Sequence, residues 1–134
     1  FADEEVPAEA RGGLLRRAST LPRLKRVLVE SRPELITDEK LEAAHEALGK
    51  GAQLEVAIGL ESADKTIREE RINKGFTLGA FERACEKLAA RGVGLVVYLL
   101  LKPMDTSEDE AIKDVWRCPR ASPSSPPSWW TGRR

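Results

Sequence analysis

Three short apolar runs, each followed by a segment with helical spacing, constrain the fold more than any other feature of the sequence. They cover residues 26–30, 54–60 and 93–101. The third is the most hydrophobic stretch of the chain and does not alternate with polar residues. That pattern is typical of a strand covered on both faces in a parallel sheet. Strands that alternate with helices pair in parallel through crossover connections. The sequence therefore predicts an α/β fold with a parallel sheet of about three strands.

Helix signals fill the segments between the apolar runs. One helix is expected to open at Thr37-Asp38-Glu39, which places negative charge at the positive end of the helix dipole. Thr77 is the predicted cap of a later helix, and Ser107 with Glu110 forms a capping box for another. The first segment, 6–19, also reads as a helix. Apolar spacing gives the predicted inward faces of the first two helices. These residues are Leu14, Leu15 and Ala18 in the first helix, and Leu41, Ala44, His45 and Leu48 in the second.

The size of the chain limits how such a sheet can be completed. A closed (β/α) barrel takes about eight strands and about 250 residues, whereas this chain has 134 residues. The sequence therefore predicts either a small open α/β domain or a partial (β/α) barrel that is a piece of a larger fold. No apolar run is long enough to cross a membrane.

Charge and composition divide the chain near residue 115. Residues 1–114 carry a net charge of −4, whereas residues 115–134 carry +4 and are rich in Pro and Ser. The tail, 115–134, is predicted to be disordered, and a shifted reading frame would also produce its abrupt change of composition. The net charge of the whole chain is zero, which argues against a nucleic-acid footprint along its entire length.

The two cysteines, Cys85 and Cys118, do not lie in a CxxC or similar cluster. An iron–sulfur cluster needs several thiolates at close spacing, so we expect none on this chain alone. Cys85 lies on the apolar face of a predicted helix, where a small buried thiol is the expected structure.

Charged and polar residues follow each of the three predicted strands. Because the carboxyl ends of parallel strands meet at one edge, about 4.8 Å apart between neighbours, these side chains could share one pocket. Two carboxylates with an Arg and a Lys would suit a zwitterion. Solvated loop charges with local salt bridges are the alternative, and spacing alone favours it. The residues are Glu30, Ser31 and Arg32, then Glu61 and Ser62, and finally Lys102.

Three ordered motifs at these strand ends resemble the radical S-adenosylmethionine superfamily. They are Val-Leu-Val-Glu-Ser-Arg-Pro-Glu (27–34), Val-Ala-Ile-Gly-Leu-Glu-Ser (56–62) and Ile-Asn-Lys-Gly-Phe-Thr (72–77). The nearest resemblance is to the archaeal branch of Fe–S oxidoreductases that includes the archaeosine-forming enzyme of tRNA modification, with the elongator catalytic subunit more distant. The resemblance covers residues 1–114 and implies the central part of a partial barrel.

The resemblance implies S-adenosylmethionine and a [4Fe–4S] cluster as cofactors of the whole enzyme and tRNA as its substrate in the cytoplasm. It assigns S-adenosylmethionine binding to Glu30, Glu61 and Lys74, and it places Arg32, Ser62 and Lys102 toward the substrate. The CxxxCxxC loop that holds such a cluster is absent here, so it would have to lie upstream of Phe1.

Two functions remain open from the sequence. One is the middle of a tRNA-modifying radical enzyme, inactive as this isolated chain. The other is a small α/β binding or interaction module without catalysis. In either case, unpaired sheet edges predict self-association.

Overall fold

The structure, a computed structural model, describes residues 5–103 and 105–117. Helices and strands alternate along the chain, and the predicted α/β class is confirmed. The elements are α1 (Ala8–Ser19), β1 (Arg26–Glu30), the short helix η1 (Pro33–Leu35), α2 (Asp38–Leu48), β2 (Gln53–Glu61), η2 (Thr66–Arg71), α3 (Leu78–Ala90), β3 (Gly94–Leu99) and α4 (Glu108–Arg117).

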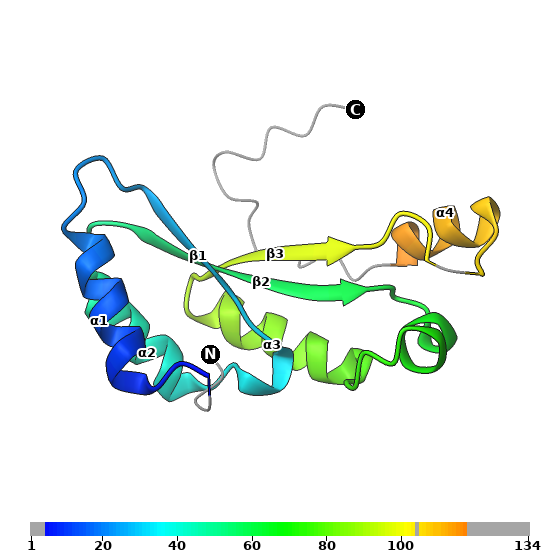
Figure 1. The fold of residues 1–134 in the computed structure, drawn as a ribbon, viewed down its shortest axis with the longest axis horizontal. Helices are drawn as coiled ribbons and strands as arrows, with labels where there is room; N and C mark the ends of the chain where they lie inside the picture. Colours follow the sequence, from blue (N-terminus) through cyan, green and yellow to red (C-terminus); the bar gives the residue numbers. More distant parts are fainter. Residues whose placement is uncertain (1–4, 104, 118–134) are drawn as a thin grey trace.

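The three strands form one parallel sheet in the order β1-β2-β3. Val29 pairs with Val56, and Ala57 pairs with Val96, so the strands follow one another across the sheet in chain order. Among the described residues the sheet is open, with β1 and β3 as its two edges. Helices α1, α2 and α3 lie on the same side of the sheet (Figure 1).

The hydrophobic core lies between the sheet and these helices. Alternate residues of β2 point into it, because side chains of a strand alternate between the two faces. Four residues of β2 meet four large residues from α2 and α3, all almost fully buried. They are Leu54, Val56, Ile58 and Leu60 on the strand, and Leu41, Leu48, Phe81 and Leu88 on the helices.

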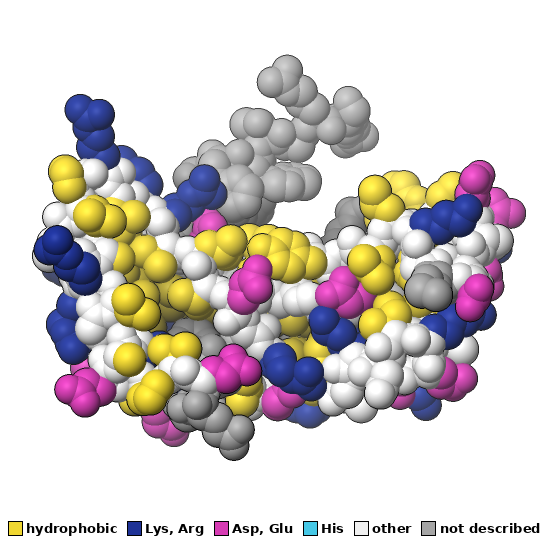
Figure 2. All heavy atoms as spheres, in the orientation of Figure 1, with side chains coloured by type: hydrophobic (Ala, Val, Ile, Leu, Met, Phe, Trp, Pro, Cys, Tyr) yellow, Lys and Arg dark blue, Asp and Glu magenta, His cyan; other side chains and the backbone are white. Residues whose placement is uncertain are grey.

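The prediction that the third strand is covered on both faces is wrong for the described part of the chain. β3 is only half-buried, and Tyr98 is 42% exposed. Leu28 of β1 is 47% exposed on the corresponding face. The physical reason is that α2 and α3 cover one face, with α1 packed on α2, so the other face remains open. Figure 2 shows hydrophobic side chains at the surface over the strands and again over α4.

Two details of the predicted helix faces are also wrong. Leu14 is 66% exposed, and only Leu15 of α1 is buried. His45 is exposed, whereas Ala47 of the same helix packs partly against the core. Helix α1 packs against α2 rather than directly on the sheet, so a narrower stripe of each helix is buried than the spacing predicts.

The predicted helix starts are confirmed by hydrogen bonds. The Thr37 hydroxyl accepts from the Lys40 amide in α2, and the Thr77 hydroxyl accepts from the Ala80 amide in α3. These bonds satisfy amide groups that lack a partner in the first turn of a helix.

The capping box of α4 forms as predicted, and its pH dependence is testable. The Glu110 carboxylate accepts from the Ser107 amide at 2.8 Å and from its hydroxyl at 2.9 Å. The Ser107 backbone bond and then the Ser107 side-chain bond lower the pKa of Glu110. A lowered carboxyl pKa stabilises the fold above the unfolded-state pKa, and this stabilisation is lost as pH falls through the folded-state pKa.

We therefore expect acid titration to weaken the start of α4. In NMR spectra, the Ser107 amide signal should titrate with the Glu110 carboxyl group, at a pH below that of an ordinary glutamate. Glu110→Gln should remove this transition. A Ser107 signal that titrates equally in Glu110→Gln would contradict the assignment.

Helix α4 runs through residue 114 to Arg117. The prediction of a disordered tail over 115–134 is therefore wrong for residues 115–117, which are helical, whereas residues 118–134, with Cys118, lie outside the described residues. No helix in the described part of the chain is both long and apolar enough to span a membrane.

Candidate functional site

An ion pair joins Glu61 at the end of β2 to Lys74 in the loop after η2. Lys74 Nζ lies 2.9 Å from Glu61 Oε1, and the two side chains are 25% and 20% exposed. Glu61 has a positive φ of 64° and follows a bulge between β2 and β3. Left-handed backbone at a residue with a side chain is strained, and such strain is concentrated at functional sites. The end of β2 is therefore shaped to present this carboxylate.

Gly59 lies directly beneath the ion pair. A Cβ atom at this position would be 2.5 Å from Glu61 Oε1 and 2.9 Å from Lys74 Nζ. Since Ile58 and Leu60 point into the core, this Cβ would point to the open face of the sheet. Only glycine at position 59 lets the two charged groups lie against the strand.

We expect Gly59→Ala to displace the Glu61–Lys74 pair with little loss of stability. Both clashing atoms are ends of flexible side chains, so the free energy of unfolding should change by less than about 1 kcal/mol. The carbon-13 shift of the Glu61 carboxyl group reports the displacement. Gly13→Ala is the control, because its added Cβ meets nothing within 4 Å. A Glu61 shift unchanged in Gly59→Ala would contradict the contact.

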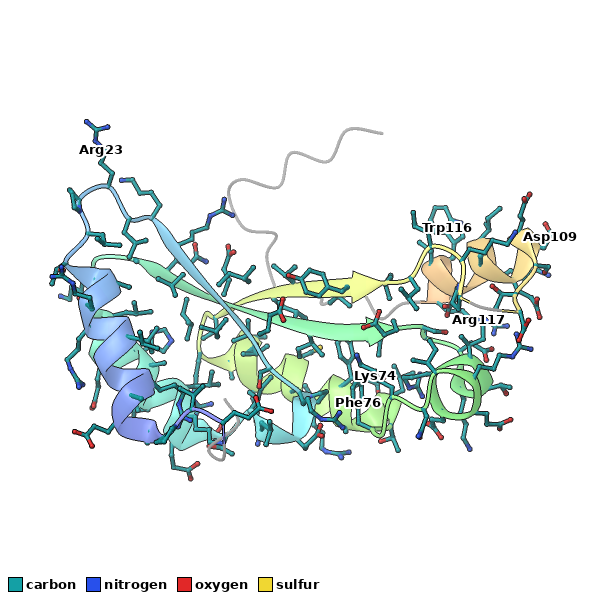
Figure 3. The ribbon with its side chains drawn as sticks, viewed as in Figure 1. Arg23, Lys74, Phe76, Asp109, Trp116 and Arg117 are labelled. Atoms are coloured by element: carbon teal, nitrogen blue, oxygen red, sulfur yellow. The ribbon has the colours of Figure 1, made fainter. Side chains whose placement is uncertain are left out.

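Arg32 links the end of β1 to the same loop. One of its terminal nitrogen atoms donates to the Gly75 carbonyl at 3.4 Å, and its guanidinium carbon lies 5.7 Å from the centre of the Phe76 ring. Its Nε donates to Glu34. Figure 3 shows Lys74 and Phe76 close together near the end of β2. The carboxyl ends of β1 and β2 therefore share one loop, which carries both Lys74 and the contacts of Arg32.

The other predicted site residues lie in different surroundings. Glu30 is exposed and makes no ion pair with another described residue. Ser62 is fully buried, and its hydroxyl accepts from the Asp64 amide at 3.1 Å. Lys102 has a 58% exposed side chain, and its Nζ lies 3.9 Å from Glu108. The structure thus brings together Glu61, Lys74 and Arg32, and it gives Ser62 a role in a turn.

The chemistry of this cluster is that of charge recognition. A carboxylate accepts hydrogen bonds from an ammonium group, whereas Lys and Arg donate to a carboxylate or phosphate. Glu61 and Lys74 partly satisfy each other's hydrogen-bonding capacity, so a ligand that used both groups would have to insert between them or lie beside them.

Sequence reasoning missed two residues that shape this region. Gly59 stands inside a strand, and an isolated glycine there signals close approach of another group. Arg68 is 1% exposed and donates to the Ser62 and Ala63 carbonyls just after β2. It lies in a run of charged residues, so nothing in the sequence marked it as buried.

No group of three or more His, Cys, Asp or Glu residues in the described part of the chain is placed to hold a metal ion. Cys85 is partly buried against the core, as its place on the helix predicted.

Comparison with known proteins corrects the assignment to the radical S-adenosylmethionine superfamily. No family model matches the chain, whether of that superfamily or of another. The named relatives below carry the name of a synthase subunit and not that of a radical S-adenosylmethionine protein. The assignment of the motifs at 27–34, 56–62 and 72–77 to that superfamily is therefore wrong, whereas the part of the resemblance that concerned archaeosine agrees with the names of these relatives. No solved structure matches the chain either.

Curated relatives match most of this chain. "Archaeosine synthase subunit beta" of Methanosarcina acetivorans is 43% identical over 118 residues, which are 87% of this chain and 34% of that protein. The protein of the same name from Thermococcus kodakarensis is 33% identical over 110 residues, 82% of this chain and 34% of that protein. The "Uncharacterized protein MJ0550" of Methanocaldococcus jannaschii is 41% identical over 112 residues, 84% of this chain and 30% of that protein. The chain is thus similar over most of its length to archaeosine synthase beta subunits, and it spans about a third of the length of the relatives it matches.

Proposed function

We propose that this chain forms part of a protein that acts in archaeosine modification of tRNA. The observation that carries the proposal is the 43% identity over 87% of the chain to a relative named archaeosine synthase subunit beta. A second relative of the same name, from another archaeon, supports it. Since the chain spans about a third of these proteins, its role is that of one segment within a larger protein.

Within that segment, the cluster of Glu61, Lys74 and Arg32 is the proposed ligand site. Its charges suit a zwitterion, with Glu61 accepting from an ammonium group and Lys74 or Arg32 donating to a carboxylate. The methionine part of S-adenosylmethionine is such a zwitterion. When bound, this cofactor supplies an activated sulfonium group, and the residues named here would only hold and orient it.

A segment exchange tests the proposed function. The matching part of the Methanosarcina acetivorans relative is replaced by this chain in a strain that lacks its own copy, and archaeosine in tRNA is measured by mass spectrometry of nucleosides. We expect the exchange to keep the modification and Lys74→Ala in the exchanged segment to reduce it at least about tenfold. Lys50→Ala, at an exposed lysine of the loop after α2, is the matched control. Full modification in Lys74→Ala would exclude this site from the function, and loss in the exchanged protein with normal expression would contradict the role of the segment.

Direct titration tests the ligand. The Glu61–Lys74 pair is partly exposed, and solvent weakens charge contacts at such a site. We therefore expect S-adenosylmethionine to bind the isolated chain with a dissociation constant no tighter than about 1 mM. Ligand-detected NMR should show this binding, and Glu61→Ala should abolish it. Binding that Glu61→Ala leaves unchanged would place the ligand elsewhere.

A binding role without catalysis is the second candidate function. The open face of the sheet favours it, because Leu28 and Tyr98 are 47% and 42% exposed there. The edge strand β3 carries no charged residue, and such edges pair readily with other strands. We expect the isolated chain to associate with itself at micromolar concentration, and sedimentation velocity would detect it. A monomer at all concentrations would argue against this role.

A further inference from the structure

A pocket lies between η2 and α4, and it is lined by residues that take no part in the cluster of Glu61, Lys74 and Arg32. Its volume is about 390 Å³, within the usual range of small-molecule sites. Figure 3 shows Arg117 between α4 and η2 in this view. Six charged residues line it, three acidic and three basic: Asp64, Glu110 and Asp114, with Arg71, Lys113 and Arg117.

Asp114 is the acidic residue of the pocket that accepts a single hydrogen bond from the described residues. It is only 5% exposed, and its Oδ1 accepts from the Asp64 amide at 2.8 Å. No other described residue donates to this carboxylate. A buried carboxylate is costly unless its oxygens are hydrogen-bonded, and an ionised carboxylate only accepts. A ligand that meets Asp114 in the pocket must therefore present a hydrogen-bond donor.

The other two acidic residues are already occupied. Glu110 accepts two hydrogen bonds from Ser107. Asp64 accepts from the Ile67 amide and pairs with Arg117 at 3.1 Å. Their charges are thus used in the capping box and in the link between η2 and α4.

The basic residues have more capacity left. Lys113 is exposed and makes no ion pair with the described residues. Arg71 donates to the Asp105 carbonyl but pairs with no carboxylate among them. Lys113 and Arg117 are four residues apart on α4 and so lie on one side of that helix. The lining of the pocket therefore offers hydrogen-bond donors to an anion and, in Asp114, a buried acceptor.

The helix that forms one wall has an unusual geometry. η2 is a π-helix over Thr66–Arg71. π-helical turns are rare and are found frequently at functional sites. Here the wider turn contributes Ile67 and Arg71 to the same pocket.

We propose that this pocket binds a nucleotide whose base carries an exocyclic amino group. The amino group donates to Asp114, and the phosphate group is held by Lys113, Arg71 and Arg117. A nucleotide carries a donor at one end and an anion at the other, which matches the buried acceptor and the basic rim. The inference rests on this pocket alone and not on the function proposed above.

Nucleotide pairs that differ in the amino group test the proposal. The full 134-residue chain is titrated by calorimetry with adenosine and cytidine monophosphates and with their deaminated counterparts, inosine and uridine monophosphates. We expect the amino-bearing nucleotides to bind with dissociation constants of about 1 mM or tighter. The deaminated ones should bind about tenfold more weakly, because a hydrogen bond to a charged acceptor is lost.

Two substitutions separate the two ends of the ligand. Asp114→Asn should remove the preference for the amino group. Asp114 also accepts a hydrogen bond from the Asp64 amide, so the thermal melt of the Asp114→Asn variant is recorded to check that it is folded. Lys113→Gln gives a second test, at an exposed residue. Lys113→Gln should weaken all four nucleotides by a similar factor without changing the melting temperature, whereas Lys50→Gln should change nothing.

Three outcomes would each overturn the proposal. They are equal binding of amino-bearing and deaminated nucleotides, unchanged binding in Lys113→Gln, and no binding at a nucleotide concentration of about 10-fold the expected dissociation constant. The segment exchange measures archaeosine in tRNA, whereas these titrations measure nucleotide binding to the isolated chain. A negative result in one test therefore does not imply a negative result in the other.

Discussion

Replacing Arg68 with alanine should lower the free energy of unfolding by about 3 kcal/mol. The side chain is 1% exposed, and one terminal nitrogen donates to the Ser62 and Ala63 carbonyls at 3.2 and 3.1 Å. The other pairs with Glu69 at 2.9 Å. Without the guanidinium group, two carbonyls in a buried turn lose their donor. Urea denaturation measures the change.

One feature of Arg68 opposes this effect. Its Nε is buried and has no hydrogen-bond partner, which costs stability in the native protein. Three hydrogen bonds outweigh one unpaired donor, so destabilisation is the expected net result. Arg71→Ala is the control on the same helix, since it removes one bond to a backbone carbonyl and should cost less than about 1 kcal/mol. If Arg68→Ala lowers the free energy of unfolding by no more than Arg71→Ala does, the guanidinium group of Arg68 does not stabilise the turn at Ser62 and Ala63.

Truncation of Phe81 should have a comparable or larger effect. Phe81 is fully buried at the start of α3 and belongs to the cluster that joins this helix to β2. Replacing a buried Phe with Ala removes apolar contact and leaves a cavity, at a cost of about 3–5 kcal/mol. We expect Phe81→Ala to unfold at much lower urea concentration than the parent chain.

Leu14→Ala is the matched control for Phe81→Ala. Leu14 is 66% exposed on α1, so its truncation should change the free energy of unfolding by no more than about 0.5 kcal/mol. The same variant also tests which face of α1 is buried. The apolar spacing of the sequence predicts that Leu14 points inward, whereas the structure exposes it. A loss of several kcal/mol in Leu14→Ala would show that α1 packs through the face that the sequence predicted.

The local elements were predictable because their signals act over a few residues. Thr77 and the pair Ser107–Glu110 cap the helices that they were expected to cap, and the helix expected to open at Thr37 does so. The three apolar runs became the three parallel strands, since strand–helix alternation leaves few other connections. Burial was less predictable: Leu14 and His45 fit an apolar spacing but point away from the core, because α1 packs on α2.

From the sequence, the candidate site could be predicted only as a group of residues at the carboxyl ends of neighbouring strands, without the contacts between them. Parallel pairing alone brings the carboxyl ends of β1 and β2 together, so Arg32 and Glu61 were expected at one edge. The ion pair with Lys74 is set by the return of the loop after η2 and by the space above Gly59. Ser62 also follows a strand, and it was expected to face the substrate. Its hydroxyl instead accepts a hydrogen bond from the Asp64 amide, two residues further along the chain.

The sequence by itself determined the α/β class, the parallel order and the helix starts, because hydrophobic periodicity, capping and crossover connections are local or nearly local constraints. Only the tertiary structure decided which face of the sheet is covered, where Arg68 is buried and that Asp64 and Asp114 meet. Asp64 and Asp114 lie on separate elements, and their hydrogen bond forms only when α4 packs against η2. Contacts of this kind depend on the packing of distant segments, which no pattern within either segment specifies.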